Sequence, residues 1–140
     1  MAGTQAELVG LLDQDPVSSA SGGSAANTLI GIAQFGGSAY YACQLGRDEW
    51  GDFYHRDLEA AGVKSDATNR VDDPTGTCMV FITPDADRTL NTFLGANLSF
   101  GPKQITAEPI AKSQYIYIEG YLASGDDSFD ACLKAQDLAQ

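Results

Sequence analysis

Cationic residues are scarce in this sequence, and their scarcity excludes several kinds of partner. The 140 residues include 8 Lys and Arg against 19 Asp and Glu, which gives a formal net charge of -11 at pH 7. Binding to a nucleic-acid polymer requires clustered Lys and Arg side chains that neutralise phosphates. An anionic membrane surface attracts proteins through the same side chains. We therefore expect neither a nucleic-acid polymer nor a membrane as a partner.

Histidine and cysteine are scarce as well. The chain has one His and three cysteines, Cys43, Cys78 and Cys132, which lie far apart in the sequence. An odd and dispersed set indicates neither a disulfide framework nor a zinc site, so we expect no bound metal. No apolar run reaches the roughly 20 residues that span a bilayer, and residues 1–16 lack the basic and apolar regions of a signal peptide. A reducing cytoplasm is the simplest location.

What is present has the composition and the rhythm of a folded α/β chain. Hydrophobic residues make up 44% of the chain and charged residues 19%, as in globular proteins. Gly36 and Gly37 are placed to end one helix, and Asp48 is a good N-cap for another. The elements expected in the first 62 residues are a helix at 5–13, a helix at 24–35, a buried strand at 38–45 and a helix at 49–61. Helices that alternate with strands indicate the α/β class.

The following residues break this alternation. Stretches 75–83 and 88–94 are rich in Thr, Val, Ile and Phe, and residues 84–87 between them have turn composition. This pattern predicts a β-hairpin, to which residues 66–71 are expected to add a third, weaker strand. The elements expected beyond it are a weak helix around 102–112, a strand at 114–119 and a last helix from Asp126 or Asp127 onward.

Two glycines before the second helix are the most informative feature of the sequence. In the stretch Ser21-Gly22-Gly23-Ser24-Ala25-Ala26-Asn27, the glycines allow backbone to approach a ligand closely. Asn27 offers both a donor and an acceptor, which suits vicinal hydroxyls, and a helix N-terminus favours electron-rich ligand atoms. The alternative is a plain loop-to-helix entry with a solvent-facing Asn27. The stretch is not a Walker A loop, because it lacks the Gly-Lys-Ser/Thr ending.

Several further motifs follow in order along the chain. They are Leu45-Gly46-Arg47-Asp48-Glu49-Trp50-Gly51-Asp52-Phe53, Ala61-Gly62-Val63, Thr75-Gly76-Thr77-Cys78, Thr83-Pro84-Asp85, Arg88-Thr89 and Gly95-Ala96-Asn97. Together with residues 22–37, they resemble the PfkB/ribokinase family of ATP-dependent carbohydrate and nucleoside kinases over about residues 7–140. Residues 88–97 and Tyr117-Ile118-Glu119-Gly120 are most similar to its adenosine-kinase-like branch.

The resemblance implies a partial ribokinase-like fold, a three-layer α/β/α core with a small antiparallel β lid. Residues 1–140 would form the substrate side of this domain, and residues 66–95 would be the inserted lid. Gly22, Gly23 and Asn27 match the substrate-binding motif of the family, whose backbone and amide groups hold sugar hydroxyls. Glu119 matches a family position near the sugar. Ligands of open α/β sheets also lie at the carboxyl ends of strands, although an ordinary solvated loop carboxylate is the alternative for Glu119.

The lid of the family covers the substrate and can also pair between subunits. Its candidate substrate contacts in this chain are Met79, Phe81, Asn91 and Phe93, and ordinary strand packing is the alternative for each. We therefore expect a small-molecule sugar or nucleoside as ligand. We also expect a homo-oligomer formed through the lid or through uncovered sheet faces.

Three features of family catalysis have no match in these 140 residues. They are an N-terminal strand ending in a sugar-binding Asp, an Asn-x-x-Glu motif linked to magnesium and phosphate, and a Gly-Ala-Gly-Asp motif that supplies the anion hole and the catalytic base. Ser124-Gly125-Asp126-Asp127 resembles the last motif only superficially, because an Asp in place of Gly would set a carboxylate where phosphate must sit. Helix capping explains this stretch better, so no catalytic residue is expected.

These observations predict the N-terminal, substrate-side part of a kinase that transfers the ATP γ-phosphoryl group to a sugar hydroxyl. The nucleotide-binding half would be absent, and the chain alone would be inactive. ATP and Mg2+ would serve the full-length family enzyme, and neither is expected to bind to this chain. The alternative is a non-catalytic module that binds a sugar or nucleoside or mediates an interaction.

Overall fold

The computed structural model describes residues 3–12, 16–66 and 68–140 of the chain. The helices are α1 (Gly3–Leu12), α2 (Ser24–Gln34), α3 (Glu49–Ala60), α4 (Ala107–Ala111) and α5 (Asp126–Leu138). The strands are β1 (Ala39–Tyr41), β2 (Leu45–Gly46), β3 (Val63–Ser65), β4 (Arg70–Val71), β5 (Thr77–Ile82) and β6 (Arg88–Phe93). Three short 3-10 turns span Gly95–Ser99, Pro102–Gln104 and Gly120–Ser124. Among the described helices, none has the length and apolar character that a membrane span requires.

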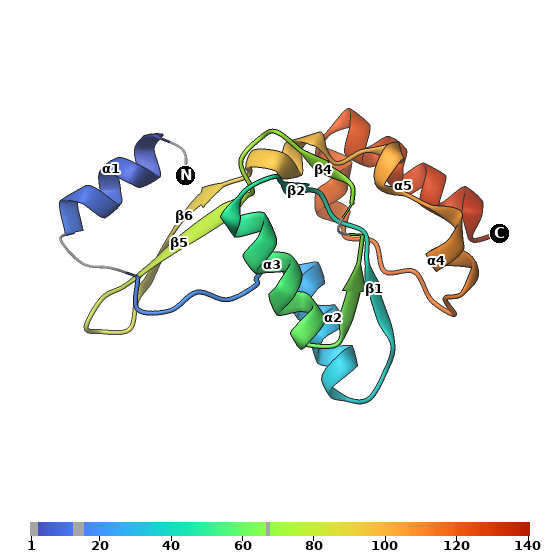
Figure 1. The fold of residues 1–140 in the computed structure, drawn as a ribbon, viewed down its shortest axis with the longest axis horizontal. Coiled ribbons are helices and arrows are strands. Elements are labelled where there is room, and N and C mark those ends of the chain that lie inside the picture. Colours follow the sequence, from blue (N-terminus) through green and yellow to red (C-terminus); the bar gives the residue numbers. More distant parts are fainter. Residues whose placement is uncertain (1–2, 13–15, 67) are drawn as a thin grey trace.

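The α/β class is confirmed by a parallel pair of strands joined through a helix. β1 and β3 run parallel with Ala39 opposite Val63, and α3 lies between them in the chain, as in a βαβ unit. Leu58 of α3, Ala26 of α2 and Val63 are completely buried and form one core cluster with Ala39. Figure 1 shows α2 and α3 together on one side of β1. This cluster fixes the N-terminal end of α2 relative to α3.

The ends of the central helices follow their predicted signals. Asp48 caps α3 and accepts a hydrogen bond from the Gly51 backbone N–H at 2.8 Å. Gly62 follows α3 with a φ of 85°, a left-handed conformation that favours glycine and stops the helix. The predicted helix at 5–13 is present as α1, and its predicted last residue lies outside the described residues.

The predicted hairpin is confirmed, but the prediction that residues 66–71 add a third strand to it is wrong. β5 and β6 pair antiparallel, with Thr77 opposite Phe93, and project away from the body of the molecule beside α1 (Figure 1). The strand predicted at 66–71 is present as β4, which instead pairs in parallel with β2. The reason lies in side chains distant in the sequence: Arg70 donates to the Asp52 carboxylate at 2.7 Å, and the Gln44 amide donates to the Asn69 carbonyl at 3.0 Å. These contacts hold β4 against α3 and β2.

The apolar run at 38–45 is also shorter as a strand than predicted. It is divided into β1 and β2, and between them the buried Gln44 side chain bonds the Asn69 carbonyl and the Gln104 amide. Because the Gln44 side chain reaches across the core in this way, it interrupts the strand pairing in the stretch between β1 and β2. The weak helix predicted around 102–112 is present as the turn Pro102–Gln104 and the short α4.

The strand predicted at 114–119 is not formed. Among the described residues, this stretch has no paired strand. Its alternating apolar pattern is that of a sheet-forming segment, yet Tyr115 is 89% exposed and Tyr117 is 56% exposed. The alternating apolar pattern therefore predicted a strand, but the described part of the chain contains no neighbouring strand with which it pairs. Its last residues are anchored: Ile118 packs against a second core cluster of Ile105, Ala131 and Ala135 between the 100–105 segment and α5.

Candidate functional site

The two glycines before α2 lie at an open surface. Gly23 is the N-cap residue of α2 and has a φ of 101°, which strains any residue with a Cβ. Its carbonyl accepts the first helical hydrogen bond, from the Asn27 N–H at 3.0 Å. A Cβ placed on Gly22 or Gly23 would meet no atom within 4 Å. The backbone of both residues is therefore accessible to a ligand, and Asn27 is exposed one turn further along α2.

Glu119 meets this helix end although it lies 95 residues later in the chain. The Ser24 hydroxyl donates to one Glu119 carboxylate oxygen at 2.6 Å, and the Tyr117 hydroxyl donates to the other at 3.1 Å. Carboxylate oxygens accept more than one hydrogen bond each, so Glu119 retains capacity for ligand hydroxyls. The contact with Ser24 thus brings Glu119 to the N-terminal end of α2, which also carries Gly23 and Asn27. Their role in holding a ligand stays a prediction.

Ser24 and Tyr117 were not predicted as site residues. Ser24 stands inside the same glycine-rich stretch, and Tyr117 lies two residues before Glu119. In an extended segment, residues two apart face the same side. That alternation was the signal in the sequence that could have identified Tyr117.

Helix α3 holds the loop that carries the glycines. The Ser21 backbone N–H donates to the Asp57 carboxylate at 2.8 Å, and the Tyr54 hydroxyl donates to the Gly22 carbonyl at 2.9 Å. The Ser21 hydroxyl also donates to the Tyr54 carbonyl at 3.3 Å. Burial raises the pKa of Tyr54 far above its ordinary value, and burial raises the pKa of the adjacent Tyr41 to about 12. Both hydroxyls therefore remain protonated donors at neutral pH.

A broad hollow borders this region. Gly22, Gly23, Asn27 and Glu119 all line it, and its volume is about 3230 Å³. Pockets for small molecules usually measure about 300–1,000 Å³. The hollow is therefore wider than a closed small-molecule site.

The predicted lid contacts lie on one face of the hairpin. Strand alternation and register place Met79, Phe81, Asn91 and Phe93 on the same face as Thr77. The Gln5 side chain of α1 contacts this side, because Thr77 donates to it at 2.7 Å and it donates to the Asn91 carbonyl at 3.0 Å. The side chains of the four predicted lid contacts are half-buried, which fits the alternative of strand packing. Contact of these four residues with substrate stays a prediction.

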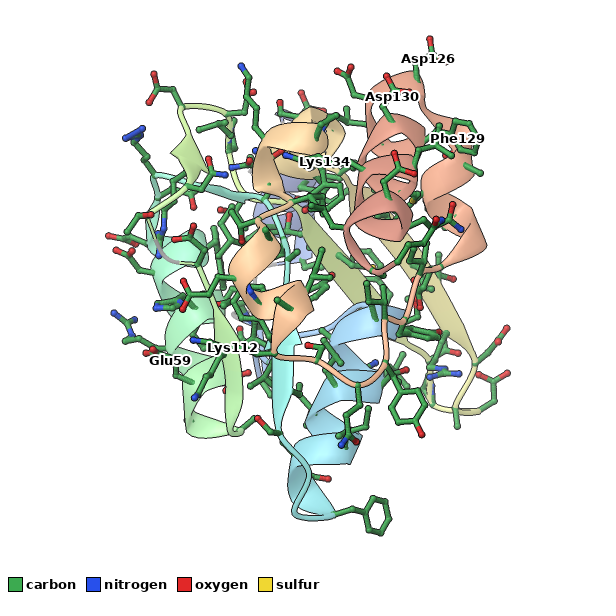
Figure 2. The ribbon with its side chains drawn as sticks, turned by 90° about the vertical axis from the view of Figure 1, so that its right-hand side faces the viewer. Glu59, Lys112, Asp126, Phe129, Asp130 and Lys134 are labelled. Atoms are coloured by element: carbon green, nitrogen blue, oxygen red, sulfur yellow. The ribbon has the colours of Figure 1, made fainter. Side chains whose placement is uncertain are left out.

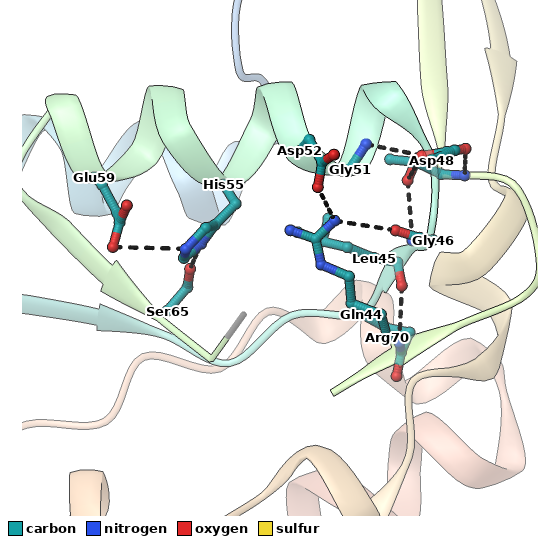
Figure 3. Close-up of polar contacts among 11 residues, drawn as sticks. Gln44, Leu45, Gly46, Asp48, Gly51, Asp52, His55, Glu59, Ser65 and Arg70 are labelled. Atoms are coloured by element: carbon teal, nitrogen blue, oxygen red, sulfur yellow. Dashed lines mark hydrogen bonds and ion pairs between the residues drawn. The ribbon is translucent and has the colours of Figure 1, made fainter. Parts of the chain in front are cut away.

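The first residues of the hairpin are fixed to the N-terminal end of α3. Thr75 donates to the Asp48 carboxylate through its hydroxyl at 2.6 Å and through its backbone N–H at 2.8 Å. Its hydroxyl also accepts from the buried Gly46 N–H at 2.9 Å. Burial raises the pKa of Asp48, but hydrogen bonds from Thr75 and Gly51 outweigh it and lower the pKa overall. Figure 3 shows Asp48 beside Gly51, whose backbone N–H donates to its carboxylate.

Glycine is required where this joint brings backbone segments together. A Cβ on Gly51 would lie 2.4 Å from the Gly46 carbonyl oxygen, and a Cβ on Gly46 would lie 2.3 Å from the Asp73 carbonyl oxygen. Arg70 donates both to the Asp52 carboxylate and to the Gly46 carbonyl (Figure 3). The motif at 45–53 therefore builds the support for the hairpin.

The acidic residues after Gly125 take a structural position. Asp126 and Asp127 occupy the first turn of α5, and Gly125 is its N-cap residue. Both carboxylates are exposed, and Figure 2 shows Asp126 and Asp130 pointing outward from the helix. Acidic side chains in a first turn favour the helix dipole. This confirms the predicted helix start at Asp126, although the cap residue is Gly125 and makes no side-chain capping hydrogen bond.

Within the described residues, no group of three or more His, Cys, Asp or Glu side chains is arranged to hold a metal ion. All three cysteines are free thiols.

Comparisons with known proteins agree on one family. The model described as "pfkB family carbohydrate kinase" matches residues 6–140. An adenosine kinase from Sinorhizobium meliloti is 36% identical, with a TM-score of 0.84 over 99% of this chain and 42% of that chain. A fructokinase from Xylella fastidiosa with bound ATP shares the fold at 21% identity and a TM-score of 0.74, covering 91% of this chain and 44% of its own.

The curated sugar kinase YegV of Escherichia coli K12, whose own function is uncharacterized, is 26% identical over 100 residues. That match covers 71% of this chain and 31% of YegV. The chain thus spans less than half the length of these relatives.

Proposed function

The chain belongs to the pfkB family of carbohydrate kinases, and on that premise we propose that it forms the substrate-binding part of an ATP-dependent sugar or nucleoside kinase. The complete enzyme would transfer the ATP γ-phosphoryl group to a sugar hydroxyl. In this chain, Gly22, Gly23, Asn27 and Glu119 would hold the hydroxyl groups of the acceptor. The similarity to an adenosine kinase at 36% identity supports a nucleoside or sugar as the ligand.

The contact between Ser24 and Glu119 is the observation that carries this proposal. It joins the N-terminal end of α2 to the end of the 114–119 segment, so backbone N–H groups, an amide and a carboxylate all border one surface. Vicinal hydroxyls need such a mixture of donors and acceptors. A net charge of -11 is no obstacle to binding a neutral sugar, whereas it opposes binding of a polyanionic nucleotide.

ATP and magnesium are assigned to the complete family enzyme rather than to these residues. Tested alone, the chain should bind acceptor without phosphorylating it. The alternative function is a non-catalytic sugar- or nucleoside-binding or interaction module. A reading frame that continues into Asn-x-x-Glu and Gly-Ala-Gly-Asp motifs would support the kinase over the module.

A ligand panel tests the binding function. Purified chain is heated with adenosine, ribose or fructose, and the expected result is a rise in Tm for at least one of them, because a ligand at 100 times its Kd stabilises by about 2.7 kcal/mol. Glu119→Gln should reduce this rise, because the amide replaces one acceptor with a donor. Glu49→Gln removes an exposed carboxylate elsewhere, in the first turn of α3, and should not affect it. No stabilisation by any ligand of the panel would refute the proposal.

Self-association and a cytoplasmic location belong to the same proposal. Val80, Ile82 and Leu90 lie on the hairpin face opposite Met79 and are 50%, 68% and 63% exposed. Burying such a face in a second copy removes apolar surface from water. Sedimentation of the chain as a monomer at all working concentrations would contradict the proposed oligomer. The free thiols fit the proposed location in a reducing compartment.

A further inference from the structure

Two backbone groups of the loop before α2 are held by side chains from one turn of α3. Tyr54 and Asp57 are three residues apart on α3 and therefore lie on the same helix face. Asp57 accepts from the Ser21 N–H at 2.8 Å, and the Tyr54 hydroxyl donates to the Gly22 carbonyl at 2.9 Å. Ser21 itself is only 9% exposed. The loop that leads into Gly23 is thus fixed from beneath by two side chains.

This fixation determines where the next backbone donor points. A peptide unit is planar and trans, so the carbonyl of one residue and the N–H of the next point in opposite directions. Because the Gly22 carbonyl points at Tyr54, the Gly23 N–H must point away from α3. A Cβ on Gly23 would meet no atom within 4 Å, so the surface around this residue is open.

The geometry assigns Tyr54 as a positioning residue that aims the Gly23 N–H at the bound acceptor, with Asp57 fixing Ser21. This inference rests on the proposed function, because it gives that N–H to a hydroxyl of the same sugar or nucleoside. Tyr54 need not touch the ligand, since it acts through the Gly22 carbonyl. Its ring also packs against the core cluster of Ala26, Leu58 and Val63, which leaves the hydroxyl little freedom to move.

Removing only the hydroxyl tests the positioning without a ligand. Tyr54→Phe keeps the ring and its packing, so any change in the NMR shifts of the Gly22 carbonyl carbon and the Gly23 amide reports the lost hydrogen bond. Tyr115→Phe removes the same atom from a residue that is 89% exposed, and serves as the control. We expect both glycine signals to shift in Tyr54→Phe and not in Tyr115→Phe. Unchanged glycine signals in Tyr54→Phe would overturn the inference.

A binding measurement tests the consequence for the acceptor. The loss of one aimed donor should raise the Kd for adenosine or fructose, whichever binds, by roughly 3- to 10-fold in Tyr54→Phe. Asp57→Ala should also raise the Kd, whereas Asp57→Asn retains an oxygen acceptor for the Ser21 N–H and should restore tight binding. Equal affinity of wild type and Tyr54→Phe would overturn the inference. Failure of the wild type to bind either ligand would instead refute the proposed function, and the NMR comparison would still decide the positioning.

Discussion

The joint between Asp48 and Thr75 offers the sharpest prediction about stability. Thr75→Val preserves the shape of a side chain that is 5% exposed but removes its hydroxyl. That hydroxyl donates to the Asp48 carboxylate at 2.6 Å, a charge-assisted bond of about 1.5–3 kcal/mol. It also accepts from the Gly46 N–H, and leaving that buried donor unsatisfied costs about 1–3 kcal/mol. The free energy of unfolding should therefore fall by about 3 kcal/mol or more.

The chain contains its own probe for this measurement. Its single Trp, Trp50, lies in the first turn of α3 and packs edge-on against Phe53 at a ring distance of 6.1 Å. Urea unfolding followed by Trp50 fluorescence therefore reports the element that Thr75 supports. Thr89→Val makes the same chemical change on the exposed part of β6 and should alter stability by less than about 0.5 kcal/mol. Equal effects of the two substitutions would refute the argument that Thr75 anchors the hairpin.

Two further predictions concern the same region and the glycine loop. Gly23→Ala should lower the free energy of unfolding by about 1–2 kcal/mol, because a φ of 101° is unfavourable for alanine, and Gly22→Ala should cost less in the same urea assay. The lowered pKa of Asp48 means that its contribution is complete above its ordinary value of 3.8 and is lost as pH falls through its folded value. Stability curves of wild type and Asp48→Asn should therefore converge below about pH 4, and parallel curves over this range would contradict the role of Asp48.

Local signals in the sequence predicted those elements whose causes are local. Helix α3 has an N-cap, an apolar face and a terminal glycine, and each of these acts within a few residues. The hairpin likewise combines two β-rich stretches with a short turn between them. Such elements were predicted nearly to their ends because their interactions do not depend on distant parts of the chain.

Long-range contacts account for the wrong predictions. Residues 114–119 have a strand pattern, but a strand also needs a neighbour, and the described chain supplies none to pair with them. Arg70 and Asn69 hold β4 beside β2 through side chains of Asp52 and Gln44, which no local propensity expresses. The predicted lid therefore has two strands rather than three among the described residues.

The candidate site was predicted through motif resemblance, and its supporting contacts were not. Glu119 and the glycine stretch were both proposed from the sequence, yet the contact between Ser24 and Glu119 joins residues 95 positions apart. Tyr54 fits the apolar spacing of α3, and this spacing alone indicates a core residue. Only the folded chain shows that its hydroxyl reaches the Gly22 carbonyl.

The most direct test of the central claim is an NMR titration of the purified chain with adenosine and, separately, with fructose. If the N-terminal end of α2 and the end of the 114–119 segment form the acceptor site, one ligand will perturb the signals of Gly22, Gly23, Asn27 and Glu119 in a saturable manner. Saturable perturbations confined to other regions, or none with either ligand, would contradict the claim that these residues hold the hydroxyl groups of a sugar or nucleoside.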